Sequence, residues 1–493
     1  MSLTGGSKFI LTGGATNYQI ARSLRFRDGS SAFLNRTPGV AGNRKQWTLS
    51  LWVKRAKLGA EQALFAVEPT TSGSDTNRLN ISFDSSDRLT IFSHSTTWRT
   101  TTRVFRDTSA WYHIVIGWNT SSGNNSITIE INGVTETVFT TNNALTINTD
   151  YGIGTTNPYR IGASYNIAGV FTQNYLGAYL AEVHHVDGQT LPATTFGAFN
   201  AVTGVWDPKV VGVGVSYGTT GFYLPFSDNS GATSTTIGKD FSANGNNFTP
   251  NNISVTAGTT NDSLVDTPTN YGTDTGAGGE VRGNYCTLNP LMAPSTGSTV
   301  STLSNGNLDA VGSATKGAFG TIQIPSTGKW YFEYTNTSFY YASYGIGTSA
   351  AQGCGSATGM FGFYQNGSNL QFNIGNNSNI GSSSGIVSQT NDIGLICIDN
   401  DNGKIWMGRS RSGVVTWAGG GTPGSSSPTW SASGQGGTYS TNYVVADGWF
   451  PLVSGGGADS WSVNFGQRPF AYAAPSGFKA LCTQNLPIPT IGS

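Results

Sequence analysis

The chain has 493 residues, and 26 Lys and Arg residues balance 26 Asp and Glu residues, so the formal net charge is zero. Charged residues make up only 11% of the sequence, whereas glycine alone fills 67 positions. Without a basic excess the chain cannot neutralise many phosphates, which argues against nucleic-acid binding. A hydrophobic content of 37%, with 12% aromatic residues, is still enough to build packed cores, which argues against a disordered chain.

The sequence predicts neither a membrane span nor a secretory signal. No apolar run approaches the roughly 20 residues that span a bilayer, so we expect no membrane insertion. The first twenty residues lack the charged and apolar stretches of a secretory signal, so we expect folding in a cytoplasm. The four cysteines are widely spaced and predict neither a disulfide framework nor a zinc site: Cys286, Cys354, Cys397 and Cys482.

Alternation of polar and apolar residues, typical of β-strands, dominates the first half of the chain. Strands are predicted over residues 23–27, 48–54, 79–83, 88–92, 111–119, 127–134 and 179–186. The run 127–134 includes Asn132-Gly133, a strong hairpin signal. Long stretches at helical spacing are absent, and the best helical candidate is 192–202, which begins with a proline.

A less apolar region, 229–296, separates this half from a second strand-rich block. Apolar residues still recur in it every few positions, so we predict an ordered connector packed on one or both blocks. In the second block, strands are predicted over 321–325, 328–334, 344–347, 360–364, 370–374, 392–398, 404–408, 449–453 and 460–465. The fold class predicted for the whole chain is all-β, with two antiparallel sandwiches joined by an irregular connector.

The first block resembles the laminin-G-like, concanavalin-like jelly-roll family. The ordered motifs that carry the resemblance are SLRFRDGSS (23–31), WTLSLWVK (47–54), WYHIVIGWN (111–119), ITIEINGV (127–134) and GAYLAEVHHVDG (177–188). The second block resembles SPRY domains through GKWYFEY (328–334), SYGIGT (343–348), DIGLICIDNDNGKIW (392–406), GWFPLV (448–453) and SWSVNFGQRPF (460–470).

These resemblances imply a division of the chain. It comprises an N-terminal arm (1–20), a laminin-G-like sandwich (21–228), the connector (229–296), a SPRY-like sandwich (297–478) and a C-terminal tail (479–493). The combination is similar to a type of bacteriophage virion protein, in which both domains and connectors such as GNNFTPNNISVTAG (245–258) occur in one chain. The resemblance therefore implies a protein of the virion exterior, made in the bacterial host cytoplasm.

The residues predict no catalytic site and no enzyme. Glycan hydrolysis needs two carboxylates facing one groove, and Glu182 and Asp187 are expected on opposite faces of a strand. His184 and His185 are adjacent in the same strand, so they too should face opposite sides unless a bulge intervenes.

No cofactor is required by this interpretation, although calcium is a candidate ligand. Several laminin-G-like domains bind calcium at the rim, and Asp28 is the position that this resemblance favours, with Asp75 as a second. Calcium needs six to eight oxygen ligands, and the sequence does not indicate the others. The run 399–403 starts like an EF-hand loop but lacks the glutamate at loop position twelve, so a turn is predicted there.

Aromatic residues in polar surroundings are candidates for ligand binding. Trp98 lies in such a stretch near His94, and we predict an exposed loop platform for glycan stacking. Trp52, Trp111, Trp330 and Trp461 lie in alternating strands and are predicted to be core residues. In the second block, loop-like positions resemble the partner-binding loops of SPRY domains: Tyr340, Tyr341, Tyr364 and Asn366.

Two kinds of role remain open from the sequence. One is a tail fibre or receptor-binding protein that contacts host surface glycan or protein. The other is a purely architectural protein, such as a head decoration or tail collar, packed against neighbouring subunits; a polysaccharide-degrading enzyme is a third, weaker alternative. In each case the expected partners are other virion proteins and further copies of the chain, with a trimer favoured for a fibre.

Overall fold

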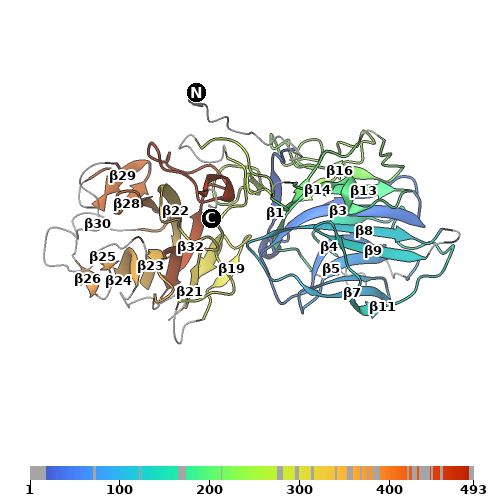
Figure 1. Ribbon diagram of the computed structural model, residues 1–493, viewed down its shortest axis with the longest axis horizontal. Helices are drawn as coiled ribbons and strands as arrows, with labels where there is room; N and C mark the ends of the chain where they lie inside the picture. The colour runs from blue at the N-terminus through green and yellow to red at the C-terminus, as the bar shows by residue number, and fades with distance from the viewer. Residues whose placement is uncertain are drawn as a thin grey trace, which may run out of the picture.

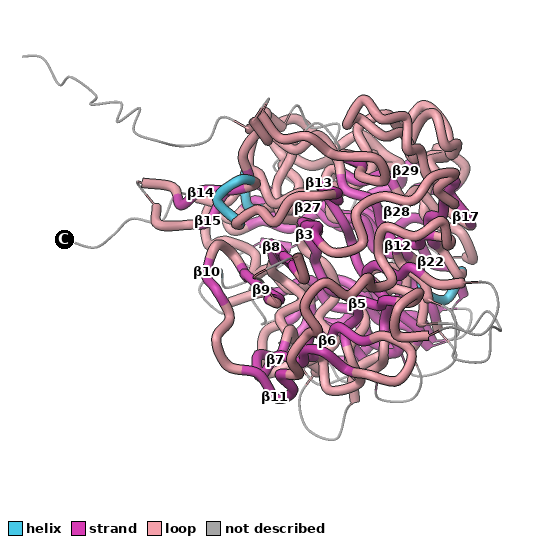
Figure 2. The backbone as a smooth tube through the Cα atoms, turned by 90° about the vertical axis from the view of Figure 1, so that its right-hand side faces the viewer, coloured by secondary structure: helices cyan, strands magenta, loops and turns pink. Residues whose placement is uncertain are grey.

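The computed structural model shows two lobes side by side, each built almost entirely from β-strands (Figure 1). It describes residues 18–69, 74–121, 123, 125–164, 174–201, 203–212, 214–274, 281–294, 299–312, 316–338, 341–351, 359–366, 369–374, 377–380, 389–418, 421–424, 430–431, 445, 448–455 and 459–487. Figure 2 shows short helical turns beside many strands; those that lie wholly within the described ranges include η1 (Asp28–Ser30), η2 (Ala193–Thr195) and η5 (Thr483–Asn485). No helix within these ranges has the length and apolarity needed to span a bilayer.

Two antiparallel sheets form the first lobe, and we call them sheets A and B. Sheet A runs in the order β10 (Val134–Thr135), β9 (Ser126–Ile131), β8 (Trp111–Asn119), β3 (Gln46–Arg55), β13 (Ala178–Asp187), β1 (Ser23–Phe26) and β18 (Ser263–Leu264), with β16 (Phe222–Leu224) also paired to β13. Sheet B runs β11 (Phe139–Asn142), β7 (Thr97–Val104), β6 (Arg88–Phe92), β5 (Leu79–Phe83), β4 (Gln62–Val67), β12 (Tyr159–Ile161), β2 (Phe33–Arg36) and β17 (Thr249–Asn251). The all-β sandwich prediction is confirmed.

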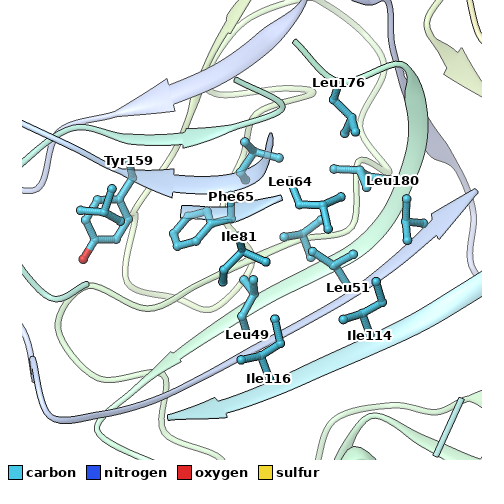
Figure 3. Packing of buried hydrophobic residues seen from close by; sticks show 14 of the residues in the cluster. Leu49, Leu51, Leu64, Phe65, Ile81, Ile114, Ile116, Tyr159, Leu176 and Leu180 are labelled. Carbon is cyan, nitrogen blue, oxygen red and sulfur yellow. The ribbon is translucent and has the colours of Figure 1, made fainter. Parts of the chain in front are cut away.

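Alternation along the strands gives sheet A two buried faces. Leu49 and Leu51 of β3 pack between the sheets, beside Ile116 and Ile114 of β8, with which they pair in register (Figure 3). Trp52 faces the other side and joins a separate hydrophobic cluster. Burying each large aliphatic side chain stabilises the fold by roughly 1.5–3 kcal/mol, so the inner face holds the sandwich together.

A layer of irregular chain covers the outer face of sheet A. It contains η2 and the hairpin of β14 (Gly197–Phe199) and β15 (Trp206–Pro208), whose Trp206 packs in the outer cluster with Trp52 and Trp111. The helix predicted over 192–202 is wrong, since one 3-10 turn gives way to β14. Strand pairing with β15 satisfies the backbone groups that a helix would otherwise have satisfied internally.

The predicted hairpin at Asn132-Gly133 is confirmed between β9 and β10. Both residues have positive φ, 49° and 76°, as a type I′ turn requires. A Cβ on Gly133 would lie 2.2 Å from the Trp206 ring, so glycine also allows the outer layer to approach this turn.

The second lobe is also built from two antiparallel sheets, C and D. Sheet C runs β19 (Thr302–Ser304), β20 (Asp309–Val311), β32 (Ser460–Asn464), β22 (Lys329–Ser338), β27 (Ile393–Asp399), β28 (Lys404–Arg411) and β29 (Val414–Trp417), with β30 (Trp430–Ser431) paired to β28. Sheet D runs β21 (Lys316–Phe319), β31 (Phe450–Gly455), β23 (Tyr341–Gly347), β24 (Met360–Asn366), β25 (Asn369–Ile374) and β26 (Asn377–Ile380). The turn predicted at 399–403 joins β27 to β28.

Tryptophans predicted as core residues are buried in both lobes. Trp52, Trp111, Trp330 and Trp461 have exposed fractions of 4%, 8%, 2% and 0%, which confirms that prediction. The cysteines within the described ranges, Cys286, Cys397 and Cys482, are buried free thiols. Cys354 lies outside those ranges.

The connector region contributes to both lobes. It supplies β17 and β18 to sheets B and A, and it also provides Asp266 and Tyr285. Lys54 Nζ of β3 donates to Asp266 Oδ2 at 2.8 Å and to the Tyr285 carbonyl at 2.7 Å, while Trp111 Nε1 donates to Asp266 Oδ1 at 3.1 Å. Because Tyr285 belongs to the core cluster of the second lobe, this buried network ties the two lobes together.

Candidate functional site

A β-bulge interrupts strand β13 on the outer face of sheet A. Ala181 pairs with Trp52 and His184 with Ser50, so two β13 residues, Glu182 and Val183, occupy the space opposite one β3 residue. Glu182 takes φ of 50°, in the left-handed region. A non-glycine residue there costs about 1–3 kcal/mol, and such strain is concentrated at functional sites. The bulge therefore marks β13 as the place to look for a site.

A cavity of about 400 Å³ opens beside the bulge. Its walls come from β13, β16 and the irregular outer layer: Tyr18, Glu182, His184, Val210, Val211, Gly212, Val215, Tyr217, Tyr223, Phe241 and Ser242. This volume falls within the range of small-molecule sites, which combine apolar walls with a few convergent polar groups.

Two phenols converge on Glu182. Tyr18 and Tyr223 donate hydroxyl hydrogen bonds to its Oε2 at 2.6 and 2.7 Å, and the two phenol oxygens lie 2.8 Å apart. Burial, followed by the charge of Glu182, raises the pKa of both tyrosines well above the ordinary value. Both phenols therefore keep their protons and serve as hydrogen-bond donors.

His184 connects the carboxylate to a third tyrosine. Its ring stacks on Tyr223 with centroids 4.2 Å apart and planes 6° apart. Its Nδ1 lies 2.8 Å from the Tyr217 hydroxyl, and its Nε2 lies 3.7 Å from Glu182 Oε2. Burial and the charge of Glu182 also raise the pKa of Tyr217. These contacts fix the orientation of the imidazole at the cavity wall.

A buried histidine supports the site from the next strands. His113 of β8 accepts a hydrogen bond at Nδ1 from Trp206 Nε1 at 3.0 Å, since an indole can only donate. Its Nε2 must then carry the proton and donate to Ser50 Oγ at 2.9 Å. Burial, with a smaller contribution from His184, lowers the pKa of His113 to about 3, so the ring is neutral. It also stacks on Trp52 at 4.8 Å, which makes it a rigid part of the scaffold.

The structure tests the predicted orientations of neighbouring residues in β13. His185 faces the inner core, where it packs at 5.5 Å from Phe222, while His184 lines the outer cavity, so their opposite orientation is confirmed. Asp187 accepts hydrogen bonds from the backbone of Asn43 and Thr220 and does not line the cavity with Glu182.

Trp98 is not an exposed platform, and that prediction is wrong. It is 8% exposed and packs edge-on against Tyr151 at 5.2 Å and Trp118 at 6.2 Å. Polar neighbours in the sequence gave no sign of these contacts because Tyr151 and Trp118 come from other segments. His94 lies nearby in the chain, half-buried, and its binding role stays a prediction.

The two candidate calcium ligands have protein partners in the structure. Asp28 pairs with Lys57 Nζ at 2.8 Å, and Asp75 accepts hydroxyl hydrogen bonds from Ser93, Ser95 and Thr96. Desolvation acts to raise the pKa of Asp75, but the hydrogen bonds that its carboxylate accepts from these hydroxyls and from the Ser95 backbone N–H outweigh it and lower the pKa. Across the described residues, no group of three or more His, Cys, Asp or Glu side chains could hold a metal ion. Calcium binding stays an untested prediction.

The candidate residues of the second lobe lie at the edge of what the structure describes. Tyr340 is outside the described residues. Tyr341 and Asn366 pair with each other at the ends of β23 and β24, so their backbones are strand and the loop prediction is wrong for these two residues. Tyr364 lies in β24, in agreement with the strand predicted over 360–364. The binding role of all three stays a prediction. Their side chains lie outside the described structure.

Sequence reasoning missed the cavity itself. Its walls come from segments more than 160 residues apart in the chain, as the Tyr18–Glu182 contact shows. The one usable signal was the His184-His185 pair beside Glu182, because a bulge in that strand would place an acid and an imidazole on one face.

Comparison with known proteins supports the fold of the first lobe. Residues 28–193 match the concanavalin A-like lectin/glucanases superfamily, in its laminin-G form. The chain therefore contains a concanavalin-like domain. A search of curated protein sequences gave no match.

Solved structures show distant similarity. A Bacteroides ovatus protein proposed to bind carbohydrate is 13% identical, with 48% of this chain and 59% of that chain covered and a TM-score of 0.31. The mouse laminin alpha1 chain domains LG4-5 are 11% identical, with 95% and 98% covered and a TM-score of 0.28. The SPRY domain of human HERC1 is 10% identical, with 38% and 99% covered and a TM-score of 0.26.

Proposed function

We propose that the protein binds glycan on a bacterial surface through the outer cavity of its concanavalin-like domain. The observation that carries the proposal is the cavity of about 400 Å³ in which aromatic rings surround one carboxylate and one imidazole. Aromatic faces suit the apolar C–H surfaces of sugars, while Glu182 and His184 provide polar partners for hydroxyl groups. The bulge in β13 positions both side chains at the cavity wall.

The proposed setting is the exterior of a bacteriophage particle, as part of a tail fibre or another receptor-binding assembly. This part rests on the resemblance of the two domains and their connector to phage virion proteins. The protein would be made in the host cytoplasm and would bind other virion proteins and further copies of itself. Closed symmetric oligomers are the usual form of such assemblies, and a trimer is proposed for a fibre.

The proposed function is binding without a chemical step. Of the carboxylates within the described residues, Glu182 is the one that lines the cavity. Glycoside hydrolysis generally requires a second carboxylate on the other side of the scissile bond. Incubation with host polysaccharide should therefore leave its chain length unchanged, and shortening would contradict this part of the proposal.

Two matched phenylalanine variants test the binding site. Phe241 lines the cavity and is 43% exposed, while Phe199 of β14 is 52% exposed and lies outside the cavity lining. Phe241→Ala should weaken adsorption to host cells by roughly tenfold, because stacking of a planar ligand on one aromatic ring is worth about 1–3 kcal/mol where it has been measured for nucleic-acid bases, and a sugar face stacks in the same way. Phe199→Ala should adsorb like the unmodified protein.

Either of two results would contradict the proposed binding site. If purified protein neither adsorbs to host cells nor blocks infection, or if both variants adsorb equally well, the cavity is not the receptor site. Circular dichroism and thermal melts of both variants would show that the fold is retained, since neither side chain is buried.

An architectural role is the second candidate. The outermost strands β10 and β11 of the two sheets carry or adjoin exposed valines, Val134 at 52% and Val138 at 62%. Unpaired strand edges with apolar side chains are suited to association with another chain. Unstable particles after deletion of the gene, together with failed adsorption by the purified protein, would favour this role over glycan binding.

A further inference from the structure

One oxygen of Glu182 is left without a partner at the cavity wall. Both phenol donors go to Oε2, and among the described residues nothing donates a hydrogen bond to Oε1. The side chain is only 6% exposed, so bulk water solvates it poorly. A ligand that donates a hydrogen bond to Oε1 would supply the partner that the described residues do not.

The charge around Glu182 favours a cationic donor. The ion pairs among the described residues give this carboxylate one basic neighbour, His184, and neither lysine nor arginine. Lys209 borders the narrow space behind the carboxylate, and Lys239 lies outside the lining, with Nζ 5.0 Å from the centre of the Phe241 ring. Neither lysine is within ion-pair distance of Glu182, so its charge is available to a ligand.

The surrounding rings also suit a cation. Tyr18, Tyr223 and Phe241 line the same cavity as Glu182. The negative faces of aromatic rings attract ammonium groups, most strongly at desolvated sites, and the contact of Lys239 with Phe241 shows such an interaction at the rim. A carboxylate oxygen and aromatic rings together form a site for a protonated amine.

We propose that the cavity selects a glycan residue that carries a protonated amine, which donates a hydrogen bond to Oε1 of Glu182. This inference rests on the proposed glycan-binding function and adds the class of sugar. Acidic sugars should be excluded, since their carboxylate would lie against Glu182. N-acetylated sugars should bind less tightly, since an amide nitrogen carries no charge and one proton.

Calorimetry with three oligosaccharides tests the inference on the full chain. The probes are tetramers of glucosamine, N-acetylglucosamine and galacturonic acid, in mildly acidic buffer in which sugar amines are protonated. The glucosamine tetramer should bind roughly tenfold or more tightly than the N-acetylated one, because an ammonium donor adds charge attraction to the hydrogen bond with the carboxylate and an amide donor does not. Equal affinities for these two tetramers, or a preference for the galacturonic acid tetramer, would overturn the inference.

A charge-neutral variant provides the second measurement. Glu182→Gln keeps an oxygen acceptor for the two phenols but removes the negative charge, so the preference for glucosamine should fall to about twofold or less. Glu136→Gln is the matched control, because Glu136 pairs with Arg103 and does not line the cavity, and it should keep the full preference. A preference that survives Glu182→Gln would also overturn the inference.

The outcomes separate this inference from the proposed function. If Phe241→Ala lowers adsorption to host cells but no probe preference is found, glycan binding stands and the amine inference fails. If none of the tetramers binds and Phe241→Ala adsorbs normally, both fail.

Discussion

Two buried carboxylates, Asp266 at the junction of the lobes and Glu182 at the cavity, show opposite uses of the same group. Asp266 is fully buried, and both of its oxygens are occupied, one by Lys54 and one by Trp111. Glu182 has one occupied oxygen and one open oxygen, and its backbone is strained. Saturated polar groups in a core serve structure, whereas a strained and half-satisfied one beside a cavity indicates binding.

The same contrast separates the histidines. His113 has both ring nitrogens bonded inside the scaffold, whereas His184 lines the cavity. The outer layer of sheet A thus has a rigid half, built on Trp52, His113 and Trp206, and a half that is open to a ligand. Substitutions in the first half should affect stability, and those in the second should affect binding.

The largest effect is expected at the junction. Asp266→Ala leaves the Lys54 ammonium buried without its counter-charge, which should lower the stability by about 3–5 kcal/mol. Burial raises the pKa of Asp266 while Lys54 opposes that shift, which shows how much the carboxylate depends on its partner. Chemical denaturation followed by tryptophan fluorescence would measure the change. A loss below about 1 kcal/mol would mean that the network does not hold the lobes together.

Trp98→Ala should also destabilise the protein. The side chain packs in the first-lobe core against Tyr151 and Trp118, so its loss should cost about 3–5 kcal/mol. A thermal melt measures this, and adsorption by the fraction that stays folded should be normal. An unchanged melting temperature together with reduced adsorption would restore Trp98 as a binding platform.

Acid should destabilise the scaffold through His113. Its folded pKa is lowered to about 3 from 6.5, so the unfolded chain binds a proton more readily between these values. Stability should therefore fall as pH drops through this window, by up to about 1.4 kcal/mol per pH unit for this histidine. Denaturation curves at several pH values, compared with His113→Gln, would show a shallower slope in the variant; identical slopes would contradict the assignment.

The smallest effect on stability is expected at the bulge. Glu182→Gly should change the stability by no more than about 1 kcal/mol, because glycine removes the strain at φ of 50° while Tyr18 and Tyr223 can still bond to each other. Glycan binding should nevertheless be lost. If Glu182→Gly lowered the stability as much as Asp266→Ala does, the role of Glu182 would be to stabilise the fold and not to bind a ligand.

The all-β fold could be read from the sequence because strand alternation and hairpin turns are local signals. The Asn132-Gly133 hairpin and the buried Trp330 both follow from residues within a few positions. The 192–202 helix failed because residues 197–199 pair with β15, a contact that no local pattern reveals, while Ala193 and Phe196 pack in the cluster on the outer face of sheet A.

The candidate site was hidden for a related reason. Tyr18, Glu182 and Tyr223 meet only after the chain has folded, because they come from three separate segments of the sequence. Trp98 was misjudged by the same mechanism, since its neighbours in sequence are polar and its neighbours in space are aromatic. The bulge that places Glu182 beside His184 arises from the pairing of β13 with β3. The sequence therefore allows a bulge in this strand but does not show at which residue it occurs.

A structure determined with a bound fragment of the host surface polysaccharide would test the central claim most directly. Glycan binding through the outer cavity predicts sugar density between Phe241 and Tyr217, with a donor group at Oε1 of Glu182. Sugar bound instead at the rim near Asp28, or on the second lobe, with the cavity unchanged, would contradict it.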